Sequence, residues 1–599
     1  MAVKVGKKYI ILKWFAAALL FVAFLLTAVT WYLSIKLKPI VTAELKDLML
    51  KTTDNLYRIE FSSVNTNVLT GISSLSDVKI IPDTAVYQQM IVLKNAPNNL
   101  YHVKLKKLAV RNFHPFRLWR QKKLNIDLLL FDNACIEMTN RQFDFNEEKP
   151  PRPKRSPYDY ISKYLKELRI RTIDFKNTSF KYIDNNNPAK PEVDAVDDLN
   201  ITLRDWLIDA QSATDKTRLY LLKDVVINLK DYAYATPDSL YYVKLNQLDF
   251  TASSGRLNIR SFMLEPRYSE QLFGSAQGYA QDRYSMQLSN IGFTGINLPL
   301  YVLRQELFAK EMNIANGHLN VVNNNTLPKK IVDKTGQYPH QLLQKAKGKL
   351  NIEKLNLRGI DISYAEFDKE GKNKGTVTFE RTSGIISNVT NVEKARAKNP
   401  FMVAKMTSYV MGSGKLDVDF KFNLIAKDGA FSYSGTLVNM EGKALNRITK
   451  PLGLVKVNRG HIKKLTFNIE ANDSIARGNV SFAYNDLSVA LLKKVKGEDR
   501  LVRKGLMSFL ANALIINSDN PNAAGVFIAA PVVQERIKTA SFFNFIWKTL
   551  FQGVKYSVGL TPQKKKQIED QIAKFEKRKA DRQERLKRRV QRSRSNKSP

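Results

Sequence analysis

The chain has 599 residues, of which 44% are hydrophobic and 25% are charged, and this composition excludes a collagen-like or wholly disordered protein. The single cysteine, Cys135, excludes an intramolecular disulfide framework and a cluster of thiolate metal ligands. The formal net charge of +39 indicates anionic partners. If the chain lies on the far side of a membrane, lipid head groups or anionic polymers are favoured as partners over genomic DNA.

The first element is an uncharged run of 22 residues, Trp14–Ile35, which is long enough to cross a bilayer as a helix. Four lysines precede it in residues 1–13, so the N-terminus is expected in the cytoplasm and the rest of the chain on the far side. A cleaved signal peptide is the alternative, but the run is too long for one and has no small-residue cleavage site. The residues expected to anchor the chain are Trp14, Phe15, Leu19, Leu20, Phe21, Phe24, Leu25, Leu26, Trp31 and Tyr32.

A short helix is expected over Pro39–Tyr57, and from Arg58 onward apolar residues alternate with polar ones in short runs. Alternation of this kind predicts antiparallel strands with one apolar and one wet face. The clearest strands are expected around residues 101–105, 124–130, 199–203, 416–422 and 465–469. Minor helices are expected over Tyr158–Leu168 and Gln341–Ala346, and exposed loops over 147–157, 185–191 and 323–330.

Two sequence matches predict internal repeats. LYHVKLKKL at Leu100–Leu108 returns as LYYVKLNQL at Leu240–Leu248, about 140 residues later. The apolar pattern that begins at Leu168 returns at Leu355, 187 residues later. We therefore expect related β units that stack along one axis.

No motif indicates catalysis. The five histidines have no metal-ligand spacing, and nucleophile-elbow, phosphate-loop and dinucleotide-binding motifs are all missing. We expect no enzyme, no cofactor and no metal, with a paired-carboxylate glycosidase as the remaining catalytic alternative.

Near the C-terminus, Phe542–Val558 has an amphipathic helical pattern with Lys548 and Lys555 on its polar side. Two interpretations stay open: a cap packed on the last strands, or a helix lying in a membrane interface. The candidate interface residues are Phe542, Phe543, Ile546, Trp547, Leu550 and Phe551. The tail, residues 561–599, carries 15 Lys or Arg against 5 Asp or Glu and is expected to be solvated, with anionic head groups as possible ligands.

With its N-terminal anchor, repeats and alternating strands, the chain resembles the AsmA-like family of Gram-negative envelope proteins, relatives of TamB. The resemblance rests on Arg58–Asp83 and on the L-x-I-x-x-I-D-F units at Leu168 and Leu355. It rests also on three C-terminal segments in which Gly435 and Gly478 lie within strands: Gly414–Leu424, Phe431–Leu437 and Gly460–Leu492. The helix at Phe542 and the basic tail depart from that pattern.

The resemblance implies an inner-membrane, single-pass protein with most of its chain in the periplasm. It further implies an elongated, repeat-built β-sheet curled into a groove (a β-taco), as in bridge-like lipid transfer proteins. On this interpretation the protein supports phospholipid transport between the inner and outer membranes and outer-membrane integrity. The candidate groove residues, chosen from the alternating apolar positions, are Val103, Leu105, Ile126, Leu128, Ile201, Leu203, Phe420 and Phe467.

Two rival functions remain. The chain could instead be an assembly or scaffold factor that offers exposed strand edges to outer-membrane proteins. A cell-wall or polyanion-binding role through the basic tail is the third. The expected division of the chain is a cytoplasmic segment 1–13, an anchor 14–35, a helix 39–57, β repeats 58–320, a second β module 321–500, a helical segment 501–560 and the tail 561–599.

Overall fold

The computed structural model describes residues 45–47, 49–51, 53–67, 71–147, 156–187, 192–219, 221–368, 373–453, 455–494, 501–503, 517–560, 581 and 584–585. The predicted anchor, Trp14–Ile35, and nearly all of the basic tail lie outside the described residues. Among the helices that are described, none has the length and apolarity needed to cross a membrane.

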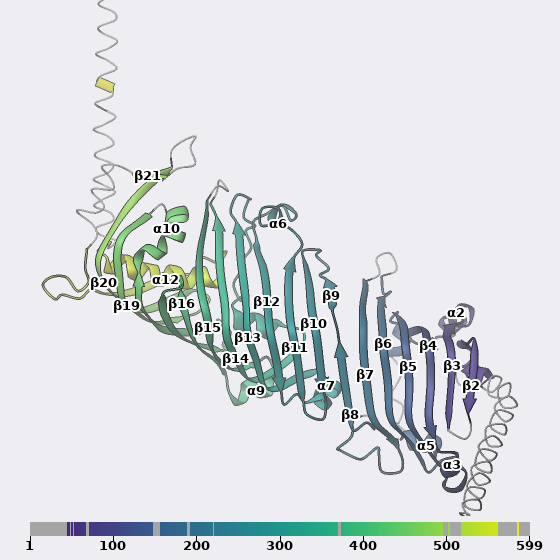
Figure 1. Ribbon diagram of the computed structural model, residues 1–599. Helices are drawn as coiled ribbons and strands as arrows, with labels where there is room; N and C mark the ends of the chain where they lie inside the picture. The colour runs from purple at the N-terminus through teal and green to yellow at the C-terminus, as the bar shows by residue number, and fades with distance from the viewer. Residues whose placement is uncertain are drawn as a thin grey trace, which may run out of the picture. The chain divides into compact units, whose positions relative to one another are not determined.

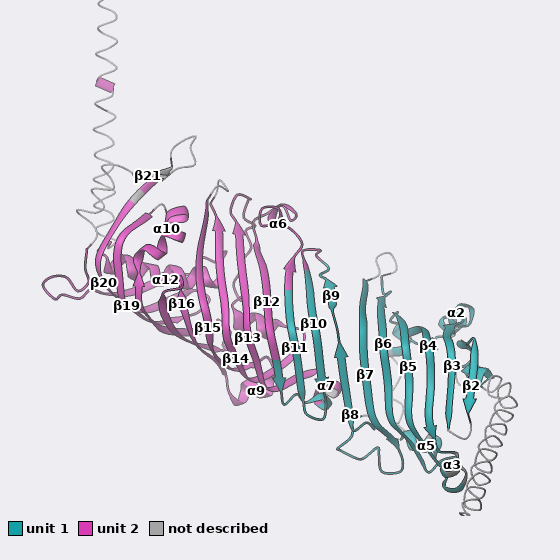
Figure 2. Cartoon of the chain, in the orientation of Figure 1, with its two compact units in different colours: residues 1–237, 242–263, 292–299 teal, residues 238–241, 264–291, 300–599 magenta. Residues whose placement is uncertain are grey.

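The described residues form 22 β-strands, and the strands make a large, long and mostly antiparallel sheet (Figure 1). The prediction of a mostly β protein is therefore confirmed. The chain divides into two compact units, residues 1–237, 242–263 and 292–299 in unit 1 and the remainder in unit 2 (Figure 2). The division falls within the strands of residues 256–294.

Unit 1 begins with helical residues 45–47 and 49–51, and its short helices lie at strand ends. Its elements are β1 (Tyr57–Glu60), β2 (Ser63–Asn67), β3 (Ile72–Pro82), α2 (Thr84–Val92), β4 (Asn99–Phe113), α3 (Pro115–Gln121), β5 (Lys123–Asn140), α4 (Asp144–Glu147), α5 (Pro157–Ile161), β6 (Glu167–Asp184), β7 (Glu192–Ile208), β8 (Asp224–Leu229), β9 (Tyr232–Ala235) and β10 (Tyr241–Thr251). The boundary between the units passes through β11 (Arg256–Pro266) and β12 (Asp282–Thr294).

Unit 2 has longer strands followed by a C-terminal helix. Its elements are α6 (Leu272–Ser275), α7 (Leu298–Arg304), β13 (Glu306–Asn324), α8 (Pro339–Lys345), β14 (Lys349–Phe367), β15 (Lys374–Thr390), α9 (Glu393–Lys398), β16 (Phe401–Val410), β17 (Gly414–Asn423), β18 (Phe431–Glu441), η1 (Gly442–Leu445), α10 (Asn446–Gly453), β19 (Val455–Ala471), β20 (Ile475–Lys494), β21 (Leu501–Arg503), β22 (Ala529–Glu535) and α12 (Phe542–Ser557). The segment expected to be helical, 501–560, thus contains two strands as well as α12.

The predicted helix Tyr158–Leu168 is much shorter in the structure, because α5 ends at Ile161 and β6 begins at Glu167. A capping box at Ser156 and Asp159 begins this short helix, with Pro157 in its first turn. The helix predicted at Gln341–Ala346 corresponds to α8.

Two strand pairs are parallel, which the alternation pattern did not predict. β5 pairs with β6 and β13 pairs with β14 in parallel, whereas the neighbouring pairs β4–β5, β6–β7 and β14–β15 are antiparallel. A parallel pair needs a connection that returns to the starting edge. The connections here contain α5 and α8, each of which begins with a proline after an extended residue.

The same strand arrangement occurs twice along the chain. Lys122, Asn133, Asp198 and Asp205 have positive φ angles, and so do Gln305, Asn316, Arg381 and Asn388, each 183 residues later (122 to 305). Helices α3 and α7 precede the first residue of each set. The strands β4–β7 therefore correspond to β12–β15, which supports the predicted repeat architecture.

The register of the repeat differs from the prediction. The irregularities of β6 at Phe175 and Thr178 return in β14 at Leu357 and Ile360, an offset of 182 residues (175 to 357). The predicted offset of 187 finds the correct strands but misplaces them by five residues. The 140-residue match links β4 to β10, whereas the structural counterpart of β4 is β12.

One face of the last strands in unit 2 is covered by helices. Phe542 and Phe545 of α12 join a buried cluster with Phe422, Phe431 and Tyr433, which we call the C-terminal core. Val554 of α12 and Ile448 of α10 pack together against a neighbouring cluster, so both helices lie on the same side of the sheet (Figure 1).

Candidate functional site

A row of apolar side chains crosses unit 1 at right angles to its strands. The cross-strand pairs run from β3 through β4, β5, β6, β7 and β8 to β10, one residue from each strand. We call it the apolar row, and its members are Leu75, Leu108, Phe131, Phe175, Ile201, Ile227 and Phe250. Directly paired residues point to the same face of a sheet, so the row forms one surface. The Phe131 and Phe175 rings stack with 4.5 Å between their centroids.

The row is covered at its ends and open in its middle. Leu75 and Phe250 are buried, whereas the five residues between them are only half-buried. Leu45 and Met49, from the helical residues 45–47 and 49–51, pack near the β3 end. Figure 1 shows no described helix lying across the middle of β6, β7 or β8. Half-buried apolar side chains on an uncovered sheet face leave a surface that apolar ligands can occupy.

The dimensions of the row suit an acyl chain. Seven strands spaced about 4.8 Å apart span about 29 Å. The hydrocarbon core of a bilayer is about 30 Å thick, so one leaflet contributes about 15 Å. An acyl chain that lies along the row would therefore contact three or four strands at once.

Four of the eight predicted groove residues lie on this face. Ile201 belongs to the row, and Leu203 pairs with Ile173 and Val225 directly beside it. Val103 and Leu105 pack with Leu108 and Phe131 near its β4 end.

Ile126 and Leu128 point to the opposite face of the sheet. Leu128 pairs with Arg111, while its neighbour Leu129 pairs with Val110 on the side of Leu108 and Phe131. Successive side chains in a strand alternate between faces, so Ile126 and Leu128 are separated from Val103 and Leu105. The strands of unit 1 thus carry apolar residues on both faces of the sheet, at different positions along the strands.

Phe420 and Phe467 lie in unit 2 within the C-terminal core. The Phe420 ring is 6.4 Å from the Phe542 ring of α12, and Phe467 is buried. Phe420 packs beside α12 and Phe467 has little exposed surface, so neither residue contributes to an open apolar face.

The C-terminal core holds an unpaired histidine. His340, in α8, is only 1% exposed, and neither ring nitrogen has a hydrogen-bond partner. Its ring lies 5.0 Å from Phe422 and 6.2 Å from Phe431. Burial lowers the pKa of His340 to about 4, and the Asp473 carboxylate and the Gly429 backbone offset this only in part.

A buried ion pair closes the edge of this core. The Arg536 guanidinium donates to Asp473 Oδ1 at 2.6 Å and lies 4.2 Å above the Tyr338 ring. The Tyr338 hydroxyl donates to the Asn472 carbonyl at 3.0 Å, and burial raises the pKa of Tyr338 to about 12. These contacts join the end of β22 to the segment before α8, which is a structural role.

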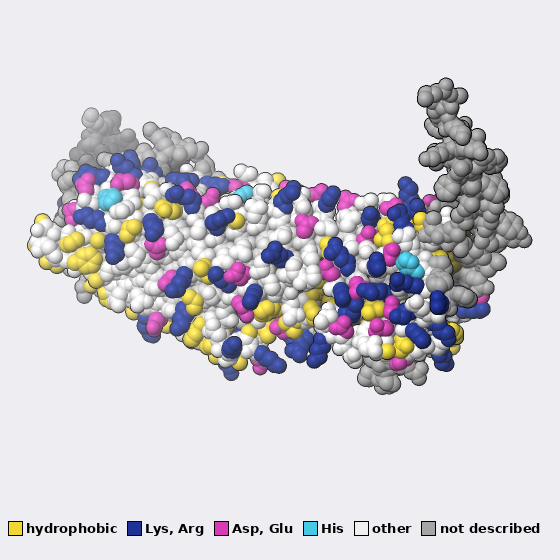
Figure 3. Space-filling model, turned by 60° about the horizontal axis from the view of Figure 1, so that its bottom comes forward, with side chains coloured by type: hydrophobic (Ala, Val, Ile, Leu, Met, Phe, Trp, Pro, Cys, Tyr) yellow, Lys and Arg dark blue, Asp and Glu magenta, His cyan; other side chains and the backbone are white. Residues whose placement is uncertain are grey.

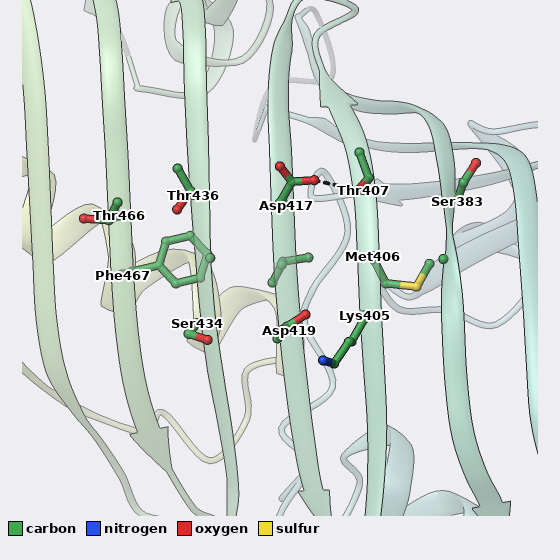
Figure 4. A pocket seen from close by; sticks show the side chains of 13 residues that line it. Ser383, Lys405, Met406, Thr407, Asp417, Asp419, Ser434, Thr436, Thr466 and Phe467 are labelled. Atoms are coloured by element: carbon green, nitrogen blue, oxygen red, sulfur yellow. Dashed lines mark hydrogen bonds between the residues drawn. The ribbon is translucent and has the colours of Figure 1, made fainter.

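One hollow on the surface of unit 2 is shallow and open, with a volume of about 530 Å³. Figure 4 shows side chains from adjacent strands around it, among them Asp417, Asp419 and Thr436. The Thr407 hydroxyl donates to Asp417 at 2.6 Å, and this bond and one from Lys415 lower the pKa of the Asp417 carboxyl. Lining of this kind is ordinary solvated β-sheet surface. The face drawn in Figure 3 likewise mixes basic and acidic side chains.

Sequence reasoning missed Phe131, Phe175, Ile227 and Phe250. Phe131 and Phe175 were hidden because positive-φ residues, Asn133 and Asn177, break the alternation just beyond them. In β5, for example, Phe131 and Ala134 pack in one cluster although they are three positions apart, an odd spacing that would place them on opposite faces of a regular strand. An asparagine or aspartate within a strand is the signal that could have located these interruptions.

Among the described residues, no group of three or more histidine, cysteine or acidic side chains lies together as a metal site would. Comparison with known proteins adds no assignment, since no protein-family model matches the chain and no curated protein matches it.

Proposed function

We propose that this protein binds phospholipid acyl chains on the open apolar face of unit 1 and thereby supports phospholipid transport between the inner and outer membranes. In this proposal Trp14–Ile35 anchors the chain in the inner membrane, and the bulk of the chain is periplasmic. We further propose that the strands of unit 1, which belong to an uncurled sheet in the structure, curl lengthwise around bound lipid and so form a groove.

The observation that carries the proposal is the apolar row, half-buried in its middle. A soluble domain normally covers a continuous apolar sheet face, because leaving it in water costs about 25 cal/mol per Å². In unit 2, α12 and α10 cover such a face, whereas Figure 1 shows no described helix across the middle of β6–β8. A transient apolar ligand explains why one face is covered and the other is not.

Photocrosslinking in cells tests the proposal. A photoreactive residue at Phe175 or Ile227 should yield lipid adducts, because both lie in the open middle of the row. The matched control is Asp174, the neighbour of Phe175 that points to the opposite face. Phe420 is a second control, since α12 covers it.

Lipid adducts confined to Phe175 and Ile227 support a lipid-binding face. Adducts to outer-membrane barrel proteins at those two positions, without lipid, would favour the scaffold function instead. Equal lipid labelling at Asp174 would show nonspecific contact with the membrane and contradict the proposal.

A further inference from the structure

The outward face of α12 is aromatic rather than polar. Five residues of this helix are exposed: Phe543, Asn544, Trp547, Phe551 and Lys555. Phe543 is 71% exposed, Trp547 49% and Phe551 41%. A surface helix normally presents charged and polar residues to water, so this arrangement needs an explanation.

The other side of the helix is fully occupied by packing. Phe545 is 3% exposed, and Thr549 and Ser557 are completely buried. Gly553 approaches β20 so closely that a Cβ atom there would lie 2.4 Å from Val480 Cβ. The close fit holds the helix in one orientation, and the exposed aromatic residues cannot turn inward without dismantling the core.

The exposed residues form a ridge along the helix. Phe543, Trp547 and Phe551 are four residues apart, so they lie above one another on one side. The Trp547 and Phe551 rings stack with centroids 5.5 Å apart, and the Lys555 ammonium lies 5.1 Å from the Phe551 ring. We call Phe543, Trp547, Phe551 and Lys555 the aromatic ridge.

We propose that the aromatic ridge docks this end of the protein on a bilayer that contains anionic lipids. Tryptophan and phenylalanine favour the boundary between acyl chains and head groups, and lysine pairs with anionic head groups. The helix has no acidic residue, and the strongly basic segment 561–599 follows it closely in the sequence. Charge therefore selects a bilayer with anionic lipids over a neutral one.

This surface is distinct from the apolar row of unit 1, so the proposal goes beyond lipid carriage and does not depend on it. The occupant competing with a bilayer is protein, either a second copy or another part of this chain. A depth measurement at the ridge separates these possibilities.

The test uses the full-length chain with Cys135→Ser and Trp547→Cys, labelled with a nitroxide at position 547. The protein is mixed with phosphatidylcholine vesicles that contain about 30% phosphatidylglycerol, or none. The expected result is that anionic vesicles raise the collision rate of the label with oxygen and lower that with a water-soluble relaxing agent. A label placed by Leu272→Cys, an exposed apolar position elsewhere in unit 2, should show no such change.

A binding assay provides the second readout. Replacing Phe543, Trp547 and Phe551 by serine should weaken recruitment to anionic vesicles by about tenfold or more. The matched control replaces Tyr268, Leu272 and Tyr301, three other exposed apolar residues of unit 2, and should bind as the parent does. Circular dichroism melts establish that both triple variants retain the parent fold.

Two results overturn the proposal. One is a nitroxide at position 547 that stays fully accessible to the water-soluble agent when anionic vesicles are present. The other is a nitroxide that is equally protected without vesicles, because protein then covers the ridge.

Discussion

The side chain of His340 is a buried base without a hydrogen-bond partner, so it makes the C-terminal core sensitive to acid. In the folded protein its pKa lies near 4, below the value of about 6.5 expected in the unfolded chain. As the pH falls below about 6.5, the unfolded chain takes up a proton that the folded protein does not. The free energy of unfolding therefore falls as the pH is lowered from about 6.5 to 4, because only the unfolded chain gains from protonation of His340 in this range.

We predict that His340→Leu removes this loss. The quantity to compare is the free energy of opening of the variant minus that of the parent. This difference should be about 2–3 kcal/mol larger at pH 4.5 than at pH 7. Leucine has nearly the volume of histidine and leaves no polar atom unpaired. Hydrogen exchange of peptides from α8 and β18, corrected for the intrinsic exchange rate at each pH, measures the difference. An equal parent-to-variant difference at both pH values would show that His340 is already protonated or solvated in the folded protein.

At the scale of the element, α12 shows why an apolar stripe does not identify the buried face. The predicted stripe contained both Phe542, which is buried, and Phe543 and Trp547, which are exposed. The buried face of α12 instead includes Thr549, Gly553 and Ser557, of which Gly553 meets Val480 of β20. Small residues allow a helix to approach a sheet closely, and no hydrophobicity scale marks them as core.

We predict that Gly553→Ala destabilises unit 2 although alanine favours helices by about 1 kcal/mol over glycine. The new methyl group would overlap the branched side chain of Val480, which is completely buried and cannot move away. The net loss should be about 1–3 kcal/mol in chemical unfolding.

Two further variants check the physical cause. The loss caused by Gly553→Ala should be smaller in a Val480→Gly background, because that change removes Cβ, Cγ1 and Cγ2, the three atoms that the new methyl group would meet. Gly453→Ala, at the end of α10 where open space surrounds the glycine, should be nearly neutral. Equal losses at Gly553 and Gly453 would mean that contact with Val480 does not determine the effect.

For the whole molecule, period-two alternation was sufficient to predict the β class and the individual strands 101–105, 124–130, 199–203, 416–422 and 465–469. It was insufficient for the face of Ile126 and Leu128, because interruptions such as that at Asn133 change which residues share a face. Alternation also did not predict the parallel pairs, because the direction of pairing depends on the connections between strands, and here these connections contain short helices that begin with proline. Backbone geometry therefore identifies the internal repeat better than sequence similarity does.

The repeat predicts which substitutions each copy tolerates. Gly359 in β14 has φ +65° and lies opposite Asn316, as Asn177 in β6, with φ +47°, lies opposite Asn133. Asparagine adopts left-handed φ angles at little cost, whereas β-branched residues do not.

Gly359→Asn should therefore change the stability of unit 2 by less than about 0.5 kcal/mol, while Gly359→Val should cost about 1–2 kcal/mol or more. At position 177 in unit 1, asparagine is the native residue. Asn177→Val should therefore cost a similar amount to Gly359→Val. Urea unfolding followed by hydrogen exchange of β14 and β6 peptides separates the two units. If Gly359→Asn were as damaging as Gly359→Val, the two positions would not be equivalent and the 182-residue register of β6 and β14 would be wrong. If asparagine is tolerated and valine is destabilising at both positions, the two copies share one feature. In each, a residue with a left-handed backbone conformation changes the face to which the following apolar side chains point.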